Sequence, residues 1–166
     1  MTNNDAPFQS SQMRVEDDWI DYNGHLNMAY YNVLFDRAID EAYTALGLGP
    51  DYIETDNASY FTAEVHLCYL RELSAGDLVT VNTRILGFDA KRIHGFQELI
   101  HSDGWVSATS EQMSLHVDMG SRKVAPFPEK IAKKLAHYAA LHEALGVPER
   151  AGRRIAIPAP RQPVTS

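Results

Sequence analysis

The stretch Asp21-Tyr22-Asn23-Gly24-His25-Leu26-Asn27, followed at once by the run from Met28 to Leu46, decides the fold of this chain. Within that run, apolar side chains recur at helical spacing in two adjoining rows: Tyr30, Leu34, Ala38, Ala42 and Leu46, and Tyr31, Phe35, Ile39 and Tyr43. Asn27 can cap the first turn of this helix, and Gly47 suits the left-handed position after its last turn. Because the apolar face is so wide, we expect other structure to enclose the helix.

The sequence after this helix predicts an antiparallel run of strands. Alternating patterns predict strands over residues 60–70, 78–88, 92–101 and 105–117, with a short last strand at Val124. A loop is expected over 49–57, a short strand within 8–15, and a final helix over 129–145, begun by Pro128. One enclosed helix followed by a meander indicates an α+β domain with an antiparallel sheet wrapped around a long central helix. The free edges of such a sheet favour pairing with a second copy.

The composition of the chain excludes several classes of protein. With 166 residues, 45% of them hydrophobic, and a net charge of −7, the chain fits one folded domain rather than a general nucleic-acid binder. No apolar run is long enough for a transmembrane helix, and Met1 to Ser11 lacks the features of a signal peptide. A cytoplasmic location and no membrane partner are therefore expected. The expected divisions are a disordered N-terminus at 1–11, the main domain at 12–127, a C-terminal helix at 128–145 and a surface tail at 146–166.

The opening turn carries the side chains best suited to chemistry. Asp21, Asn23 and His25 alternate around a glycine immediately before a helix, whose free N–H groups and partial positive charge can stabilise an oxyanion. A nearby carboxylate can act as a general base or as a nucleophile on a carbonyl. However, Asp, Asn and Gly are also ordinary turn and capping residues, so spacing alone leaves both interpretations open.

Metal sites and thiol chemistry are not expected. A calcium loop with Gly24 at its sixth position would place Trp19 and Tyr30 at the first and twelfth positions, where neither can ligate the ion. The histidines of the strand region lie without the spacing of metal ligands: His66, His94, His101 and His116. The single cysteine, Cys68, is expected to be a buried and inert thiol. Glu64 has an open role: the default is a solvent-facing strand residue, and the alternative is an approach to the partner's site in a dimer. The role of Glu111 is also open, with packing or strand pairing as the default.

The turn Asp21-x-Asn23-Gly24-His25-x-Asn27, followed by a Tyr-rich helix, resembles the hotdog-fold acyl thioesterases. It is similar to the Asp-x-Asn-x-His-x-Asn segment of the plant acyl-carrier-protein thioesterases, and Asp21-x-x-Gly24 is similar to the catalytic turn of the 4-hydroxybenzoyl-CoA thioesterase class. Three longer segments resemble the betainyl-CoA thioesterases of carnitine catabolism: DDWIDYNGHL at 17–26, LGFDAKRIH at 86–94 and SEQMSLHVD at 110–118. The resemblance covers roughly residues 12–127 and implies a hotdog fold.

The resemblance also implies roles for individual residues. Asp21 matches the carboxylate that attacks the substrate or activates water, and the backbone N–H of Met28 matches the oxyanion donor. Asn23 and His25 match polar partners of that carboxylate, and Asn27 with Met28 is expected to line the acyl site. The implied activity is hydrolysis of a short acyl-CoA, with betainyl-CoA as the leading substrate and no cofactor.

A betainyl-CoA substrate would make two further demands on the site. Its phosphates need cations, for which Lys91 and Arg92 are candidates, although solvated turn charges explain them equally well. Its trimethylammonium group needs aromatic faces, for which Tyr31 and Trp105 are candidates beside Tyr22 and Tyr30, although core packing explains each of them too. The working unit is expected to be a homodimer or homotetramer. A hydratase or dehydratase acting on acyl-CoA, and a non-catalytic acyl-CoA binding module, are the alternatives.

Overall fold

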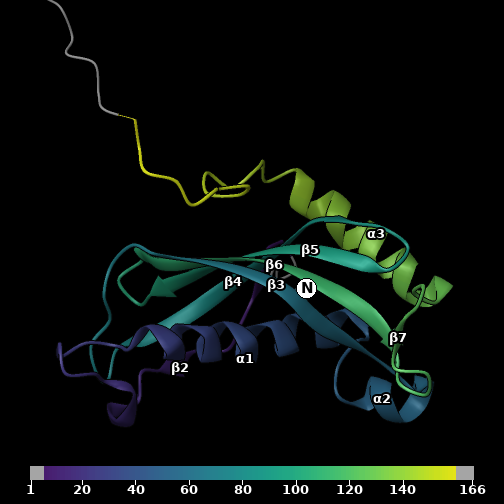
Figure 1. The fold of residues 1–166 in the computed structure, drawn as a ribbon, viewed down its shortest axis with the longest axis horizontal. Coiled ribbons are helices and arrows are strands. Elements are labelled where there is room, and N and C mark those ends of the chain that lie inside the picture. The colour runs from purple at the N-terminus through teal and green to yellow at the C-terminus, as the bar shows by residue number, and fades with distance from the viewer. Residues whose placement is uncertain (1–5, 160–166) are drawn as a thin grey trace, which may run out of the picture.

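One long helix, α1 (Met28–Leu46), lies along one face of a curved antiparallel sheet in the computed structural model, which describes residues 6–159 (Figure 1). The long strands follow the order β4-β5-β6-β3, and the short strands β1 and β2 pair with β4 while β7 pairs with β6. The strands are β1 (Phe8–Gln9), β2 (Met13–Arg14), β3 (Ala58–Tyr69), β4 (Leu78–Phe88), β5 (Arg92–His101), β6 (Val106–Asp118) and β7 (Lys123–Val124). The predicted α+β hotdog architecture is confirmed.

Helix α1 begins and ends where the sequence predicts. The Asn27 side chain accepts the Ala29 N–H, and Gly47 closes the helix with a φ of 84°, a left-handed conformation that glycine adopts without strain. Every residue of the two predicted apolar rows except Tyr30 is buried, and Leu34, Phe35 and Leu46 are almost fully so. The helix is therefore the core of the domain, and its N-terminus has a fixed position.

Strand β3 departs from simple alternation. The register with β6 shifts between Thr62 and Glu64, where a bulge inserts one extra residue. Tyr60 packs edge-on against Tyr43 of α1, so Phe61 next to it faces away from the helix. Leu67, beyond the bulge, also packs toward the helix, so the strict alternation predicted over residues 60–70, which would put Phe61 and Leu67 on one face, is wrong.

Several short elements also differ from the prediction. The expected loop at 49–57 contains a helix, α2 (Asp51–Asp56), which ends at Asn57 with a φ of 49°. Tyr52 anchors this helix through a 3.0 Å hydrogen bond between its hydroxyl group and Nε2 of His116. One turn of helix is too short to show an amphipathic repeat, so the pattern missed it. A 3-10 turn, η1 (Asp17–Trp19), lies just before the opening turn.

The described segments near both ends of the chain join the sheet and the core. The expected disordered segment 1–11 includes strand β1, whose Phe8 and Gln9 pair with β4, while residues 1–5 lie outside the described part. Helix α3 (Glu129–Glu143) ends two residues before the predicted position, and Nδ1 of His142 accepts the Ile85 N–H of β4. The predicted tail forms no helix or strand over 146–159, and its last seven residues, 160–166, lie outside the description. No helix within residues 6–159 is long and apolar enough to cross a membrane.

Candidate functional site

A cleft of about 500 Å³ lies at the N-terminus of α1. One wall is the opening turn together with the start of α1, and the other is the segment that leaves β3. Its lining comprises Asp21, Tyr22, Asn23, His25, Leu26, Asn27, Met28, Tyr31, Tyr69, Leu70, Arg71 and Glu72. The structure thus brings together six of the nine predicted site residues, Asp21, Asn23, His25, Asn27, Met28 and Tyr31, and leaves out Trp105, Lys91 and Arg92.

Backbone hydrogen bonds hold the opening turn closed. The Asp21 N–H donates to the His25 carbonyl (3.1 Å), and the Gly24 N–H donates to the Asp21 carbonyl (2.9 Å). Gly24 has a φ of 83°, which a residue with a Cβ adopts only with strain. The Leu26 N–H also donates to the Leu73 carbonyl (2.8 Å), so the turn is tied to the opposite wall.

The carboxylate of Asp21 is held at one oxygen only. Oδ1 accepts the Asn23 N–H at 2.8 Å, whereas Oδ2 has no hydrogen-bond partner within the described chain. The residue is partly buried in the wall of the cleft. One carboxylate oxygen is therefore available to a ligand or a water molecule.

The first turn of α1 offers an unpaired donor to the same cleft. Asn27 uses its side-chain oxygen on the Ala29 N–H (3.0 Å) and its carbonyl on the Tyr30 N–H (3.0 Å). Across residues 6–159, nothing accepts the Met28 N–H. This donor carries the partial positive charge of the helix N-terminus, so it is suited to an anionic oxygen.

His25 has a partner that sequence reasoning missed. Its Nε2 lies 3.2 Å from Oε2 of Glu72, on the other wall of the cleft. The segment bearing Glu72 is fixed because the Leu70 and Arg71 N–H groups both donate to the Ser107 carbonyl, at 2.9 and 3.0 Å. In sequence Glu72 is an ordinary acidic residue after a strand, and only the topology brings it to His25.

Two tyrosines form the aromatic part of the cleft. The rings of Tyr31 and Tyr69 meet edge-on at 5.0 Å, and the Tyr69 hydroxyl donates to the Met28 carbonyl at 3.1 Å. Burial raises the pKa of both phenols, so they stay neutral at physiological pH. Tyr30, by contrast, stacks on Trp19 outside the cleft. Tyr69 was missed because its alternating pattern marks it only as a strand residue.

Trp105 does not line the cleft, contrary to the prediction that it binds substrate there. Its ring lies between His101, stacked at 4.4 Å, and the guanidinium of Arg71, at 3.9 Å. Both aromatic faces are therefore covered within the protomer. Its contribution is to position Arg71, which does line the cleft.

Lys91 and Arg92 lie far from the cleft of their own chain. They stand at the β4–β5 turn, whereas His101, at the other end of β5, stacks on the Trp105–Arg71 pair. At the rise of an extended strand, the two ends of β5 are roughly 30 Å apart. Arg92 is also engaged, because its Nε donates to Asp89 at 2.7 Å, and this hydrogen bond is the main reason that the pKa of Asp89 falls to about 2.

The remaining candidate residues, Glu111, Glu64 and Cys68, lie outside the cleft. Glu111 holds Nε2 of His94 (2.7 Å) with one oxygen and the Gly152 N–H (2.7 Å) with the other, so it fastens the C-terminal segment to the sheet. Glu64 is exposed on the edge strand β3. Cys68 is only partly buried, which corrects the expectation of a core thiol, because it lies on the face of β3 away from α1. Within the described chain, no three His, Cys, Asp or Glu side chains are grouped to hold a metal ion.

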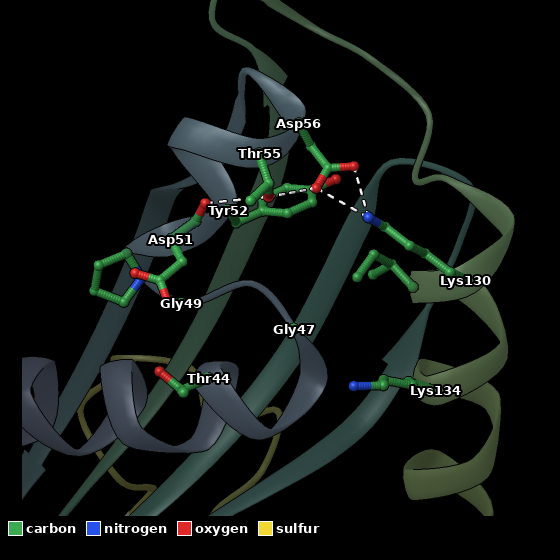
Figure 2. A pocket seen from close by; sticks show the side chains of 11 residues that line it. Thr44, Gly47, Gly49, Asp51, Tyr52, Thr55, Asp56, Lys130 and Lys134 are labelled. Carbon is green, nitrogen blue, oxygen red and sulfur yellow. Dashed lines mark hydrogen bonds and ion pairs between the residues drawn. The ribbon is translucent and has the colours of Figure 1, made fainter.

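A second hollow, of about 310 Å³, lies between α2 and α3 at the other end of α1 (Figure 2). Its two lysines already have partners. Nζ of Lys130 contacts both carboxylate oxygens of Asp56 at 2.7 and 2.9 Å, and Lys134 donates to the Ala45 carbonyl at 3.4 Å. These bonds tie α3 to α2 and to the C-terminus of α1, so the two lysines hold the helices together.

A sheet wrapped around one helix, with a carboxylate turn set against the N-terminus of that helix, is the arrangement of the hotdog-fold thioesterases. Residues 15–135 match the Thioesterase-like superfamily, and the chain belongs to this family.

The known relatives are consistent with this assignment. The chain is 39% identical to the betainyl-CoA thioesterase of Pseudomonas aeruginosa, over 85% of this chain and 89% of that protein. It is 34% identical to the L-carnitine dehydrogenase/betainyl-CoA thioesterase of Agrobacterium fabrum over 91% of this chain, although it spans only 31% of that longer protein. Its fold is similar to that of the hypothetical protein SAV2348 of Staphylococcus aureus, solved in complex with CoA, with a TM-score of 0.84, 34% identity, and coverage of 92% and 96% of the two chains.

Proposed function

We propose that this chain hydrolyses short acyl-CoA thioesters, with betainyl-CoA as its substrate, to the free acid and CoA. The observation that carries the proposal is that a half-free carboxylate, Asp21, and the unpaired Met28 N–H lie on the same wall of one cleft. A thioester hydrolase needs these two groups: one to deliver the oxygen nucleophile and one to stabilise the oxyanion. The names of the relatives in Pseudomonas aeruginosa and Agrobacterium fabrum support the acyl group and a place in carnitine metabolism.

In the proposed mechanism, the thioester carbonyl oxygen accepts the Met28 N–H. Asp21 either removes a proton from water that attacks the carbonyl carbon, or attacks that carbon itself to give a mixed anhydride that water then opens. In both routes the carbon–sulfur bond breaks and CoA leaves as a thiolate that takes up a proton. His25, held by Glu72, and Asn23 are the proposed partners that orient the water. A single turnover in ¹⁸O-labelled water distinguishes the routes, because only the anhydride route places the label in Asp21 when the anhydride opens at the aspartyl carbonyl.

The acyl group of betainyl-CoA ends in a trimethylammonium, which makes no conventional hydrogen bonds and is bound by aromatic faces and negative charge. Tyr31 and Tyr69 supply two rings of the cleft, and Tyr22 supplies a third that is 98% exposed in this protomer. The carboxylates of Asp21 and Glu72 add negative charge. This combination supports a cationic acyl group over a long apolar one.

We further propose that the working unit is a homodimer, or a homotetramer built from such dimers, formed through β3. This strand ends the sheet order, so its outer edge pairs with no strand of the described chain. Apolar side chains at that edge are exposed, among them Phe61 at 42% and Val65 at 39%. A long, apolar, unpaired edge favours pairing with a second copy, and it would place the two clefts beside the interface.

The test is release of free CoA thiol from a panel of acyl-CoAs by the wild type and Asp21→Asn. Rapid hydrolysis of betainyl-CoA, lost in Asp21→Asn, is expected. Wild-type turnover by Asp21→Asn would remove Asp21 from the mechanism. If short neutral acyl-CoAs were hydrolysed as fast as betainyl-CoA, the proposed substrate would be wrong. A monomer in light scattering would refute the proposed dimer.

The same panel separates the two rival functions. A hydratase or dehydratase would exchange water across an enoyl double bond and release no thiol. A non-catalytic binding module would bind acyl-CoA equally well in the wild type and in Asp21→Ala, with no turnover by either.

A further inference from the structure

Arg71 is a cation in the wall of the cleft, and one stacking contact orients its side chain. Its backbone is fixed on both sides, because its N–H donates to the Ser107 carbonyl at 3.0 Å and its carbonyl accepts the Ser107 hydroxyl at 2.6 Å. Its guanidinium lies 3.9 Å from the centre of the Trp105 ring, whose other face is backed by His101. Although Arg71 is an exposed residue, its positive charge therefore has a stacking partner within the protomer without any ligand.

The guanidinium of Arg71 nevertheless has no anionic partner. Within residues 6–159 it makes no hydrogen bond or ion pair, and its neighbour Glu72 is engaged with His25. Stacking covers the flat face of a guanidinium and leaves the N–H groups at its edge free to donate. In Arg71 these donors are preorganised and unused.

A second arginine in the chain shows what the same arrangement looks like when it is complete. Arg37 lies over Trp19 at 5.1 Å, and its guanidinium contacts Glu16 at 3.4 Å. Both arginines are stacked on a tryptophan, but only Arg37 has a carboxylate. In a protein with a net charge of −7, a cation left unpaired at the proposed active site indicates an anionic ligand.

We infer that Arg71 binds a phosphate group of CoA. This inference rests on the proposed function, because an acyl-CoA is the anion that would enter this cleft. A guanidinium edge can meet two phosphate oxygens at once, which makes it a strong and directional phosphate contact. The assignment gives Arg71 the role that the sequence suggested for Lys91 and Arg92. CoA offers two sources of the same chemistry, its pyrophosphate and its 3′-phosphate.

The test compares three thioesters with the same acyl group: the CoA, 3′-dephospho-CoA and pantetheine derivatives of the acyl group that the wild type hydrolyses fastest. Loss of a charge-assisted contact predicts that Arg71→Ala raises KM for the CoA thioester about 10- to 100-fold, with kcat within about twofold. For the pantetheine thioester, Arg71→Ala and wild type should have the same KM. If Arg71→Ala also raises KM for the dephospho-CoA thioester, Arg71 binds the pyrophosphate. If that increase in KM disappears, Arg71 binds the 3′-phosphate. Arg71→Lys should recover part of the affinity.

Arg37→Ala is the matched control, since it removes an arginine from a tryptophan outside the cleft and should leave every KM unchanged. An unchanged KM for acyl-CoA in Arg71→Ala would overturn the inference, and so would an equal penalty on all three thioesters, which would mean that Arg71 only shapes the cleft. If the wild type releases no thiol, the proposed function fails, and calorimetry of free CoA binding to the wild type and Arg71→Ala still tests the inference. Equal affinities in that measurement would refute it.

Discussion

Replacing Asn27 should separate the structural role of the α1 N-terminus from its proposed catalytic role. The Asn27 side chain accepts the Ala29 N–H at 3.0 Å, and the neighbouring Met28 N–H is the proposed oxyanion donor. Asn27→Ala removes the acceptor and leaves the Ala29 N–H without a partner. The loss of such a cap predicts a decrease of about 1 kcal/mol in the free energy of unfolding. Asn27→Asp keeps an acceptor at the same place and should leave stability equal or slightly higher, since a negative charge suits a helix N-terminus.

The two variants should behave in the opposite order in catalysis. A carboxylate at position 27 would lie roughly 4–6 Å from an oxyanion on the Met28 N–H, where the repulsion at an effective dielectric constant of 20 is of order 3–4 kcal/mol. The oxyanion carries only part of a full charge in the transition state, and solvent screens the partly exposed site. A cost of at least about 1.4 kcal/mol remains a reasonable expectation, which lowers kcat at least about tenfold. Asn27→Ala should lower kcat less, because Met28 stays in the first turn.

Urea unfolding and thiol release from acyl-CoA measure the two effects separately. Asn32→Asp is the control, since it adds the same charge to an exposed position further along α1 and should change kcat little. A wild-type kcat in Asn27→Asp would exclude repulsion at the oxyanion, and so would a loss of activity that followed the loss of stability in both variants.

Three further outcomes are expected. Glu72→Gln weakens the 3.2 Å contact with His25 and should lower kcat/KM roughly tenfold in the thiol assay. Its Tm should change little, because the Glu72 side chain is 70% exposed. Glu16→Gln, outside the cleft, should leave both kcat/KM and Tm unchanged. Gly24→Ala meets no atom within 4 Å of its new Cβ, so its cost of about 1 kcal/mol in urea unfolding should come from the φ of 83° alone, and Gly24→Asn should recover much of it. Burial raises the pKa of Tyr43 from 10.0 to about 12, so the unfolded chain loses this proton first, and stability should fall by up to roughly 3 kcal/mol between pH 10 and pH 12. Tyr43→Phe should lose about 1–2 kcal/mol at pH 7, through the hydroxyl bond to Ser114, and should remove that part of the decline at high pH.

The features that the sequence predicted well are those decided by neighbours along the chain. The bounds of α1 follow from its apolar rows, from Asn27 before it and from Gly47 after it, all local signals. Asp103-Gly104, a local hairpin signal, likewise joins β5 and β6. Asp21, Asn23, His25 and Met28 could be predicted to share one wall of a site, because a tight turn and a helix start hold them together regardless of the rest of the fold.

The features that were missed depend on contacts between distant segments. Glu72 and Arg71 enter the site only because β3 runs back along α1 and ends beside its N-terminus, a pairing that no periodicity records. The position of Trp105 could not be predicted for the same reason: the sequence left substrate binding and core packing open for it, and the fold stacks its ring with Arg71 and His101. The bulge between Thr62 and Glu64 reversed the faces of half a strand without any glycine or proline to mark it.

The sequence left two interpretations of the opening turn, capping and chemistry, and the structure assigns the cap to one residue. Asn27 alone caps α1, so Asp21 is not needed for that task. The Asp21 carboxylate instead braces its own turn with one oxygen and leaves the other without a partner. A turn that only had to introduce a helix would have no need to tie itself to Leu73, 47 residues beyond Leu26, or to place His25 against Glu72. These ties fix two distant segments around the Asp21 oxygen and the Met28 N–H, which is the rigid support that the proposed catalytic pair would require and a helix cap would not.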